Sequence, residues 1–261
     1  MKRRSHSVMA LALACCLSPV AAGHAAQLKV FASVALTSVL EQLSPAYERK
    51  TGDKVLITYD VSAGLMKRIA ANEAVDVIIV TEAMIDDLQK QGKIAAGSAA
   101  VIADTKVSVV AKAGAAKPDI SSAEALKQAL LAAKSVAYSD PANGGLSGVV
   151  AKRTIEKLGI AAQLAGKTVL AGGGQTGAVV AKGDAELGIA QASEIVPVAG
   201  TQLIGPLPGD LASMTVFAAG ARTRSESAES AKALIDFLTG PDAAQSLKAN
   251  GFDPRSDLHQ R

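Results

Sequence analysis

The chain lacks tryptophan altogether, and aromatic side chains make up only 3% of its 261 residues. Its core must therefore be built from Ala, Val, Leu and Ile, which suits helices packed closely on a sheet. Both cysteines, Cys15 and Cys16, lie near the N-terminus, so the sequence after residue 26 excludes disulfide bonds and thiol catalysis. His259 is the only histidine beyond that point. We therefore expect no metal site and no histidine catalyst in the body of the chain.

Residues 1–26 have the layout of a secretory signal peptide. A basic start at 2–4 precedes a mostly apolar segment at 8–20, and small residues follow at 22–26, where cleavage is expected. The apolar segment is shorter than the about 20 residues that a membrane-spanning helix needs. We therefore expect export to the periplasm and no membrane insertion after cleavage.

The net charge argues against nucleic acid as a partner. Removing residues 1–26 takes away three positive charges and no negative one, so the formal net charge of +3 falls to 0. The sequence also has no basic stripe with interleaved aromatic residues. About 235 residues remain, enough for one large domain or for two lobes of ordinary size.

Strand-like and helix-like patterns alternate along the chain. Short apolar runs typical of strands occur at 28–33, 54–60, 76–81, 105–114, 135–139, 168–172, 186–191 and 214–221, and helical periodicity occurs at 35–52, 62–73, 82–92, 148–159, 176–183 and 226–239. Strand–helix units in series predict an α/β fold in which a parallel sheet carries helices on both faces.

Two of the strand-like runs are expected to connect separate lobes. The segments 106–112 and 214–220 have similar apolar character and bracket a second set of strand–helix units. We therefore expect lobe 1 to comprise residues 27–105 and 214–261, and lobe 2, residues 106–213, to be inserted into it.

Small polar residues gather at four corners where a strand is followed by a helix, at 32–37, 60–64, 138–148 and 172–177. In open α/β sheets, ligands bind outside the carboxyl ends of the strands. A helix N-terminus there offers unpaired N–H groups and a partial positive charge. Two corners from each lobe, facing one another, would form an anion-binding cleft without Lys or Arg. The alternative is that each corner is an ordinary helix cap.

Several segments resemble one family along most of the chain. LKVFASVALTSVL, DVSAGLMKRIAANEAVDVIIV, LGIAQASEI and FLTGPDAAQSLKANGF are similar to the periplasmic molybdate-binding proteins of ABC transporters, over nearly all of residues 28–253. The resemblance implies a type II periplasmic-binding-protein fold, in which two lobes joined by two strands close on a small anion. YSDPANGGLSG, ELGIAQASEIVPV and GPLPGDL resemble a branch that includes the periplasmic aconitate isomerase, which works without a cofactor.

The resemblance also implies a set of ligand-binding positions. Ser62 matches a family serine, whereas Ala35 stands at another, with Ser33 two residues earlier as a substitute. Gln191 stands where the family has a tyrosine. A lost hydroxyl costs a tetrahedral oxyanion about 1–3 kcal/mol, which argues against molybdate, whereas side-chain amides suit planar carboxylates. From the corners and the resemblance together, the expected ligand-binding residues are Ser33, Ala35, Ser62, Gly64, Asn143, Leu146, Ser147, Gln175, Thr176 and Gln191.

An allylic isomerisation needs a general base and donors that hold the carboxylates of a delocalised carbanion. The candidate bases are Glu194, Glu82 and Tyr59. Each has a structural alternative, because Glu82 can serve the first turn of its helix, Glu194 can start a short helix, and Tyr59 can lie at the edge of the core.

Three functions remain open from the sequence. The first is a periplasmic isomerase that converts trans-aconitate into cis-aconitate without a cofactor. The second is a receptor that binds molybdate, another small oxyanion or an organic acid without chemistry, for which an ABC permease is the expected partner. The third is a structural or partner-binding role, which the four corners disfavour. A closing cleft works in a monomer, which is the expected state.

Overall fold

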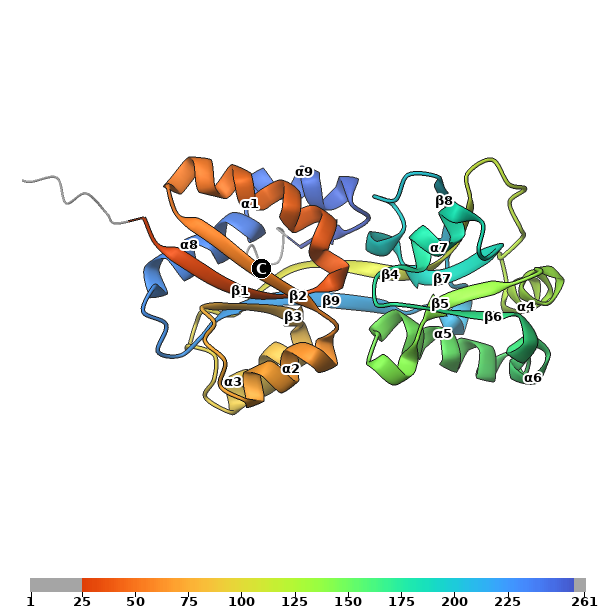
Figure 1. Cartoon of the computed structure of the whole chain (residues 1–261), viewed down its shortest axis with the longest axis horizontal. Helices are drawn as coiled ribbons and strands as arrows, with labels where there is room; N and C mark the ends of the chain where they lie inside the picture. Colours follow the sequence, from red (N-terminus) through yellow and green to blue (C-terminus); the bar gives the residue numbers. More distant parts are fainter. Residues whose placement is uncertain (1–24, 256–261) are drawn as a thin grey trace, which may run out of the picture.

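The computed structural model describes residues 25–255, and most of the predicted signal peptide lies outside the described residues. The protein has two halves, joined by the long strand β4 (Ala100–Lys112) and by the strand β9 (Met214–Ala221) (Figure 1). The first half further contains β1 (Gln27–Ser33), η1 (Val34–Leu36), α1 (Thr37–Thr51), β2 (Lys54–Asp60), α2 (Ser62–Ala70), β3 (Val77–Thr81), α3 (Glu82–Lys90), α8 (Ala228–Thr239), α9 (Pro241–Ala249) and β10 (Asp253–Pro254).

The second half is built from the chain between the two connecting strands. It contains α4 (Ala123–Ala132), β5 (Val136–Ser139), η2 (Pro141–Asn143), α5 (Leu146–Lys157), α6 (Ala161–Leu164), η3 (Ala165–Lys167), β6 (Thr168–Ala171), α7 (Thr176–Lys182), β7 (Leu187–Gln191), η4 (Ala192–Glu194), β8 (Thr201–Pro206) and η5 (Gly209–Leu211). The bounds of β2 coincide with the predicted segment 54–60, whereas α5 begins two residues before the predicted start at 148.

The sheet follows the order β2-β1-β3-β9-β4-β7-β5-β6, with β8 and β10 also paired to β4. Strands joined through a helix, such as β1 and β2 or β5 and β6, are parallel. The strand β9, however, runs antiparallel to β3 and β4, and β4 runs antiparallel to β7. The prediction of a parallel sheet was therefore wrong for the connecting strands. Parallel pairing requires a crossover connection, usually a helix, between two strands of the same sheet. Each connecting strand instead enters from the other half of the molecule.

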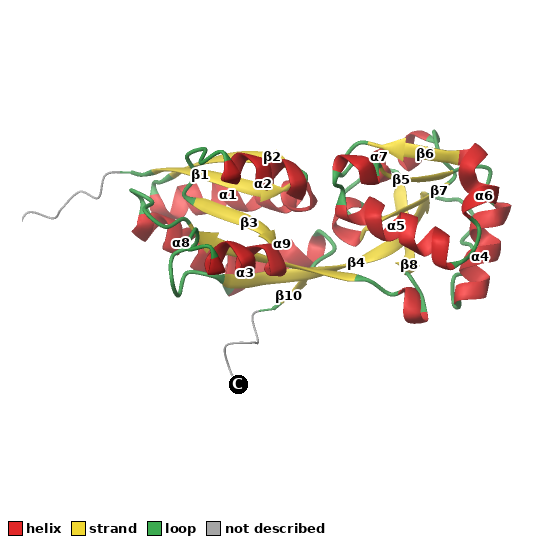
Figure 2. Ribbon diagram, turned by 90° about the horizontal axis from the view of Figure 1, so that it is seen from below, coloured by secondary structure: helices red, strands yellow, loops and turns green. Residues whose placement is uncertain are grey.

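The strand β4 belongs to both halves. Residues from Ala100 to Lys106 pair with β9, whereas residues from Val107 to Lys112 pair with β7 and β8. Figure 2 shows the same strand bridging the two halves from a second direction. Any rotation of one half relative to the other must therefore be absorbed close to Lys106 and Val107.

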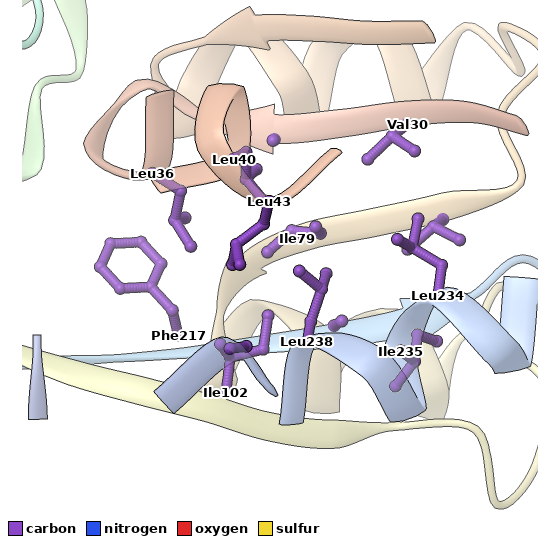
Figure 3. Packing of buried hydrophobic residues seen from close by; sticks show 14 of the residues in the cluster. Val30, Leu36, Leu40, Leu43, Ile79, Ile102, Phe217, Leu234, Ile235 and Leu238 are labelled. Atoms are coloured by element: carbon purple, nitrogen blue, oxygen red, sulfur yellow. The ribbon is translucent and has the colours of Figure 1, made fainter. Parts of the chain in front are cut away.

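Each half has helices on both faces of its sheet, because its central strands are apolar on both sides. In β3, Val77 and Ile79 pack under α1 and α8, whereas Ile78 and Val80 pack against α2 and α3. Figure 3 shows the first of these layers, in which Phe217 lies at one end of a row of aliphatic side chains. Burial on both faces explains why this strand reads as a continuous apolar run without alternation.

The helix α4 was not predicted, although it carries a recognisable start signal. The Ser122 hydroxyl accepts a hydrogen bond from the N–H of Ala125, which is an N-terminal cap.

No helix within residues 25–255 is both long enough and apolar enough to span a bilayer.

Candidate functional site

All four predicted corners contribute to one cavity between the two halves. The lining residues are Ser33, Val34, Ala35, Val61 and Ser62 from the first half, and Ser139, Gly145, Leu146, Gly173, Gly174, Gln191 and Glu194 from the second. Its free volume is about 10 Å³, close to the need of a single water molecule. A larger ligand therefore requires the two halves to move apart.

Two helices direct their N-termini at this cavity from opposite sides. The helix α2 begins at Ser62 and α5 begins at Leu146, and both residues line the cavity. The first N–H groups of an α-helix have no partner within the helix. Each helix therefore offers main-chain donors and the positive end of its dipole to an anion in the cavity.

The hydroxyl group of Ser62 is buried without a hydrogen-bond partner among residues 25–255. The residue is 2% exposed and lines the cavity. A buried hydroxyl that is left unpaired destabilises the protein by about 1–3 kcal/mol, so such a group calls for an explanation. A ligand oxygen in the cavity would supply the missing acceptor.

The other hydroxyls of the cavity are engaged. The Ser33 hydroxyl accepts the N–H of Ala35 at 3.5 Å. The hydroxyl of Ser139 lies 3.4 Å from that of Thr176, and both residues are buried. Because either hydroxyl can donate to the other, the pair can offer a ligand a hydrogen-bond donor or an acceptor.

Glu194 supplies the carboxyl group of the cavity. It ends η4, directly after β7, and is buried. The Ser147 hydroxyl donates to its Oε2 at 3.0 Å, and the N–H of Gln191 donates to the same oxygen at 3.3 Å. Burial raises the pKa of Glu194 above its ordinary value of 4.5, although the two hydrogen bonds act in the opposite direction. A buried carboxyl group with a raised pKa is a candidate for proton transfer.

Among the described residues that line the cavity, none is Lys or Arg. The guanidinium of Arg68, on α2, instead bonds Glu73 at 3.0 Å and lies 3.8 Å from the carboxylate of Asp60. The charge of an anionic ligand in this cavity would thus be met by hydroxyls, amides and helix dipoles.

Glycines of the second half allow the halves to approach closely. A Cβ on Gly173 would lie 2.5 Å from Cγ1 of Val61, and a Cβ on Gly144 would lie 2.5 Å from Cβ of Ala63. Real Cβ atoms do not come so close, so any side chain at either position would force the halves apart. Gly144 also has φ of +77°, which disfavours other residues.

Comparison with known proteins places the chain in a family. Residues 28–253 match the family described as bacterial extracellular solute-binding protein. The chain belongs to this family.

Curated relatives fall into two groups. Aconitate isomerase from Pseudomonas sp. is 33% identical over 233 residues, which cover 87% of this chain and 87% of that protein. The molybdate-binding protein ModA of Azotobacter vinelandii is 27% identical over 237 residues, covering 88% of this chain and 91% of that protein. These matches confirm the resemblance to molybdate-binding proteins and to a branch that contains aconitate isomerase.

Solved structures confirm the fold of a two-lobed periplasmic binding protein. The periplasmic molybdate-binding protein of Azotobacter vinelandii superposes with a TM-score of 0.71 at 24% identity, covering 86% of this chain and 98% of that one. The sulfate-binding protein SubI of Mycobacterium tuberculosis reaches 0.69 at 17% identity, covering 89% and 88%.

Most of the expected ligand-binding residues lie in or beside the cavity. Those that line it are Ser33, Ala35, Ser62, Leu146 and Gln191, together with the candidate base Glu194. Two more lie behind the lining, since Ser147 bonds Glu194 and Thr176 faces Ser139.

Three expected ligand-binding residues do not line the cavity. Asn143 is exposed and donates to Oδ2 of Asp140, which caps η2. Gln175 is exposed at the start of α7. Gly64, in the first turn of α2, does not line the cavity, and a Cβ at this position would meet the carboxylate of Asp60.

The other two candidate bases lie outside the cavity lining. Glu82 is exposed as the first residue of α3. Tyr59 is half-buried against the core under α1, where burial and then the charge of Glu41 raise its pKa to about 12. A phenol with so high a pKa stays protonated near neutral pH and is a poor base.

Sequence reasoning missed some cavity residues. Ser139 ends β5 and Val61 precedes α2, and both line the cavity. Ser139 carries a usable signal, because a serine that ends a strand before a glycine-rich corner faces the edge where ligands bind. For Val61 and Gly173, the decisive property is contact across the cleft, which no local pattern encodes.

Within residues 25–255, no three His, Cys, Asp or Glu side chains are placed to hold a metal ion.

Proposed function

We propose that the protein is a periplasmic isomerase that converts trans-aconitate into cis-aconitate by proton transfer in the cleft between its two halves. The observation that carries this proposal is the buried carboxyl group of Glu194. It lines a cavity otherwise equipped with donors for anions, and burial raises its pKa above the ordinary value, which makes its carboxylate a stronger base than an exposed one.

The reaction transposes a double bond and needs no oxidant or reductant. Glu194 removes a proton from the methylene carbon, and the electron pair of that C–H bond becomes the new C=C bond. The electrons of the old C=C bond take up a proton at the former vinyl carbon. The same carboxyl group can return the proton it removed, so atoms and charge balance without a cofactor.

The donors of the cavity suit the intermediate of this reaction. The carbanion formed by proton loss is delocalised into neighbouring carboxylates, so negative charge grows on their oxygens. The N-termini of α2 and α5 and the free hydroxyl of Ser62 are placed to stabilise that charge. The relative with 33% identity, an aconitate isomerase, supports this choice of substrate.

Proton nuclear magnetic resonance of trans-aconitate incubated with the protein in deuterated water tests the proposal. We expect the cis isomer to appear, with deuterium in its methylene position to the extent that the proton on Glu194 exchanges with solvent before it is returned. Glu194→Gln should lower the rate at least about 100-fold, because it removes the base, while substrate still shifts the melting temperature.

Glu186→Gln is the matched control. It lies in the same half, and its carboxylate accepts the N–H of Lys134 at 2.7 Å. It should keep the wild-type rate. Absence of isomerisation by the wild-type protein from mildly acidic to mildly basic pH would refute the proposal.

A receptor function is the second candidate. A lining of hydroxyls, an amide and helix N-termini without Lys or Arg also suits a bound oxyanion, and two molybdate-binding proteins are relatives. Glu194 favours the isomerase, since a receptor without chemistry needs no buried proton-transfer group in its cavity. Calorimetry with aconitate, citrate, tricarballylate, molybdate and sulfate separates the two functions. Binding of molybdate alone, without turnover of aconitate, would favour a receptor that delivers its ligand to an ABC permease.

Under either function we propose the lobes expected from the sequence, residues 27–105 with 214–261 and residues 106–213. We also propose that the chain is exported to the periplasm and acts there as a monomer.

A further inference from the structure

The turn that carries Glu194 is tied to both connecting strands. The N–H of Ser193 donates to Oγ1 of Thr105 on β4 at 3.2 Å. The side-chain amide of Gln191 donates to Oγ1 of Thr215 on β9 at 3.1 Å. Ser193, inside the turn, and Gln191, just before it, therefore each bond a threonine hydroxyl on one of the strands that join the halves.

The two threonines are direct partners in the sheet. Thr105 lies opposite Thr215 in the antiparallel ladder of β4 and β9. Residues opposite one another in such a ladder place their side chains on the same face, so both hydroxyls reach the same turn. The pair lies beside the point where β4 leaves β9, since the next residues of β4 pair with β7 from Val107 onward.

The Thr105 hydroxyl has a defined direction. Its hydrogen is used in a 2.9 Å bond to the carbonyl oxygen of Gly251, and the residue is 1% exposed. A hydroxyl has only one hydrogen, so its lone pairs must face the N–H of Ser193. Gly251 itself packs on the carbonyl of Ala192, where a Cβ would come within 2.6 Å. The first half therefore contacts the turn at two points, through Thr105 and through Gly251.

We propose that Thr105 and Thr215 are positioning residues, one on each connecting strand, that hold the carboxyl group of Glu194 at the site of proton transfer. This inference rests on the proposed isomerase function. The two residues do not line the cavity and act through the turn. Misplacement of a reacting group by about 1 Å can cost on the order of 100-fold in rate, so the loss of either hydroxyl should slow the chemical step.

The test replaces each hydroxyl by a methyl group of similar size. Thr105→Val and Thr215→Val should lower kcat for trans-aconitate about tenfold or more, with a smaller change in KM, because substrate donors stay in place. The pH profile of kcat should also shift, since the surroundings of Glu194 change. Thr105→Ser keeps the hydroxyl and should restore kcat and the profile.

Thr168→Val is the matched control. Its hydroxyl donates to the carbonyl of Leu164 at 2.9 Å, on β6 and away from the cavity. The control is half-buried like Thr215 and should lose stability to a similar degree as Thr215→Val, but it should keep the wild-type kcat and pH profile per folded molecule. A purely structural role for the two threonines would make their variants behave like this control.

The outcomes separate this inference from the proposed function. A wild-type protein without isomerase activity contradicts the function itself. An active wild type whose Thr105→Val and Thr215→Val variants keep kcat, KM and pH profile contradicts the positioning role alone. If Thr105→Val does not fold, Thr215→Val decides the question, because Thr215 is only half-buried and its loss disturbs the core less.

Discussion

The two sides of the cleft are built from different chemistry. Both halves present serine hydroxyls and a branched aliphatic side chain, but only the second half adds glycines, an amide and the carboxyl group of Glu194. The proton-transfer group thus lies on one side, and the free hydroxyl of Ser62 lies on the other. Neither side forms a complete site alone, so activity must depend on how closely the halves meet.

The same contrast governs the fit between the halves. Val61 and Ala63 project from the first half toward Gly173 and Gly144 of the second. Side chains on one surface therefore meet bare backbone on the other, which brings the donors of the second half close to those of the first. Three substitutions test this division of roles, beginning with the one that should affect the site most.

Gly173→Ala should keep the cleft from closing fully. Its Cβ would lie 2.5 Å from Cγ1 of Val61, and overpacking of this kind costs about 1–3 kcal/mol. Because this clash arises wherever the halves meet as they do in this structure, the affinity for the substrate should fall by up to about 100-fold. Isothermal calorimetry measures the affinity.

Two further variants make the result for Gly173 specific. Val61→Ala combined with Gly173→Ala removes the clashing methyl group and should recover most of the affinity. Gly166→Ala, also in the second half, meets open space and should change nothing. Equal affinity of Gly173→Ala and wild-type protein would show that this contact does not limit closure.

Ser62→Ala should act on the free and bound protein with opposite signs. Removing an unpaired buried hydroxyl should raise the melting temperature of the free protein. The variant should also bind substrate about tenfold more weakly, since a hydrogen bond to a charged group contributes about 1.5 kcal/mol or more. Thermal melts and calorimetry on the same samples measure both effects.

Ser193→Ala provides the comparison for Ser62. Its hydroxyl is likewise buried without a partner among the described residues, but Ser193 does not line the cavity. It should gain stability without losing affinity. Similar affinities for the Ser62 and Ser193 variants would contradict a ligand role for the Ser62 hydroxyl.

The sequence indicated where the site lies more reliably than which side chains face it. Its strand-to-helix corners meet at one cavity because carboxyl ends of strands share an edge within each half. Asn143 and Gln175 occupy such corners and yet face away, since Asp140 binds the amide of Asn143 and Gln175 begins its helix at the surface. The direction of a side chain within a turn depends on local hydrogen bonds that composition does not reveal.

The features that depend on distant partners could not be predicted. The pairing of Thr105 with Thr215 follows from the register between two strands separated by the whole second half. The antiparallel direction of β9 has the same origin, because the chain returns from the other half. Glu194 was predicted from its place after an apolar strand. Its hydrogen bond from Ser147 could not be predicted, because it depends on the packing of α5 beside η4, 47 residues away in the sequence.

The smallest expected effect is on the stability of the folded protein and comes from the carboxyl group of Glu194, which is buried among uncharged groups. Burial raises the pKa of Glu194 in the folded protein above the ordinary value of 4.5 that applies when the chain is unfolded. Between these two values the folded state binds more protons than the unfolded state, so the stability contributed by this group falls as pH rises. Glutamine stays neutral throughout.

Glu194→Gln should therefore melt at a higher temperature than wild-type protein near neutral pH. A difference of about 2–4 °C corresponds to about 1 kcal/mol for a chain of this size. The difference should shrink as pH falls toward 4.5 and vanish below it, where Glu194 is protonated in both states. Melting curves of both proteins across this range measure the effect, with Glu186→Gln as the exposed reference. A constant difference at every pH would mean that Glu194 has the same pKa in the folded and the unfolded protein, which would contradict the effect of burial on this group.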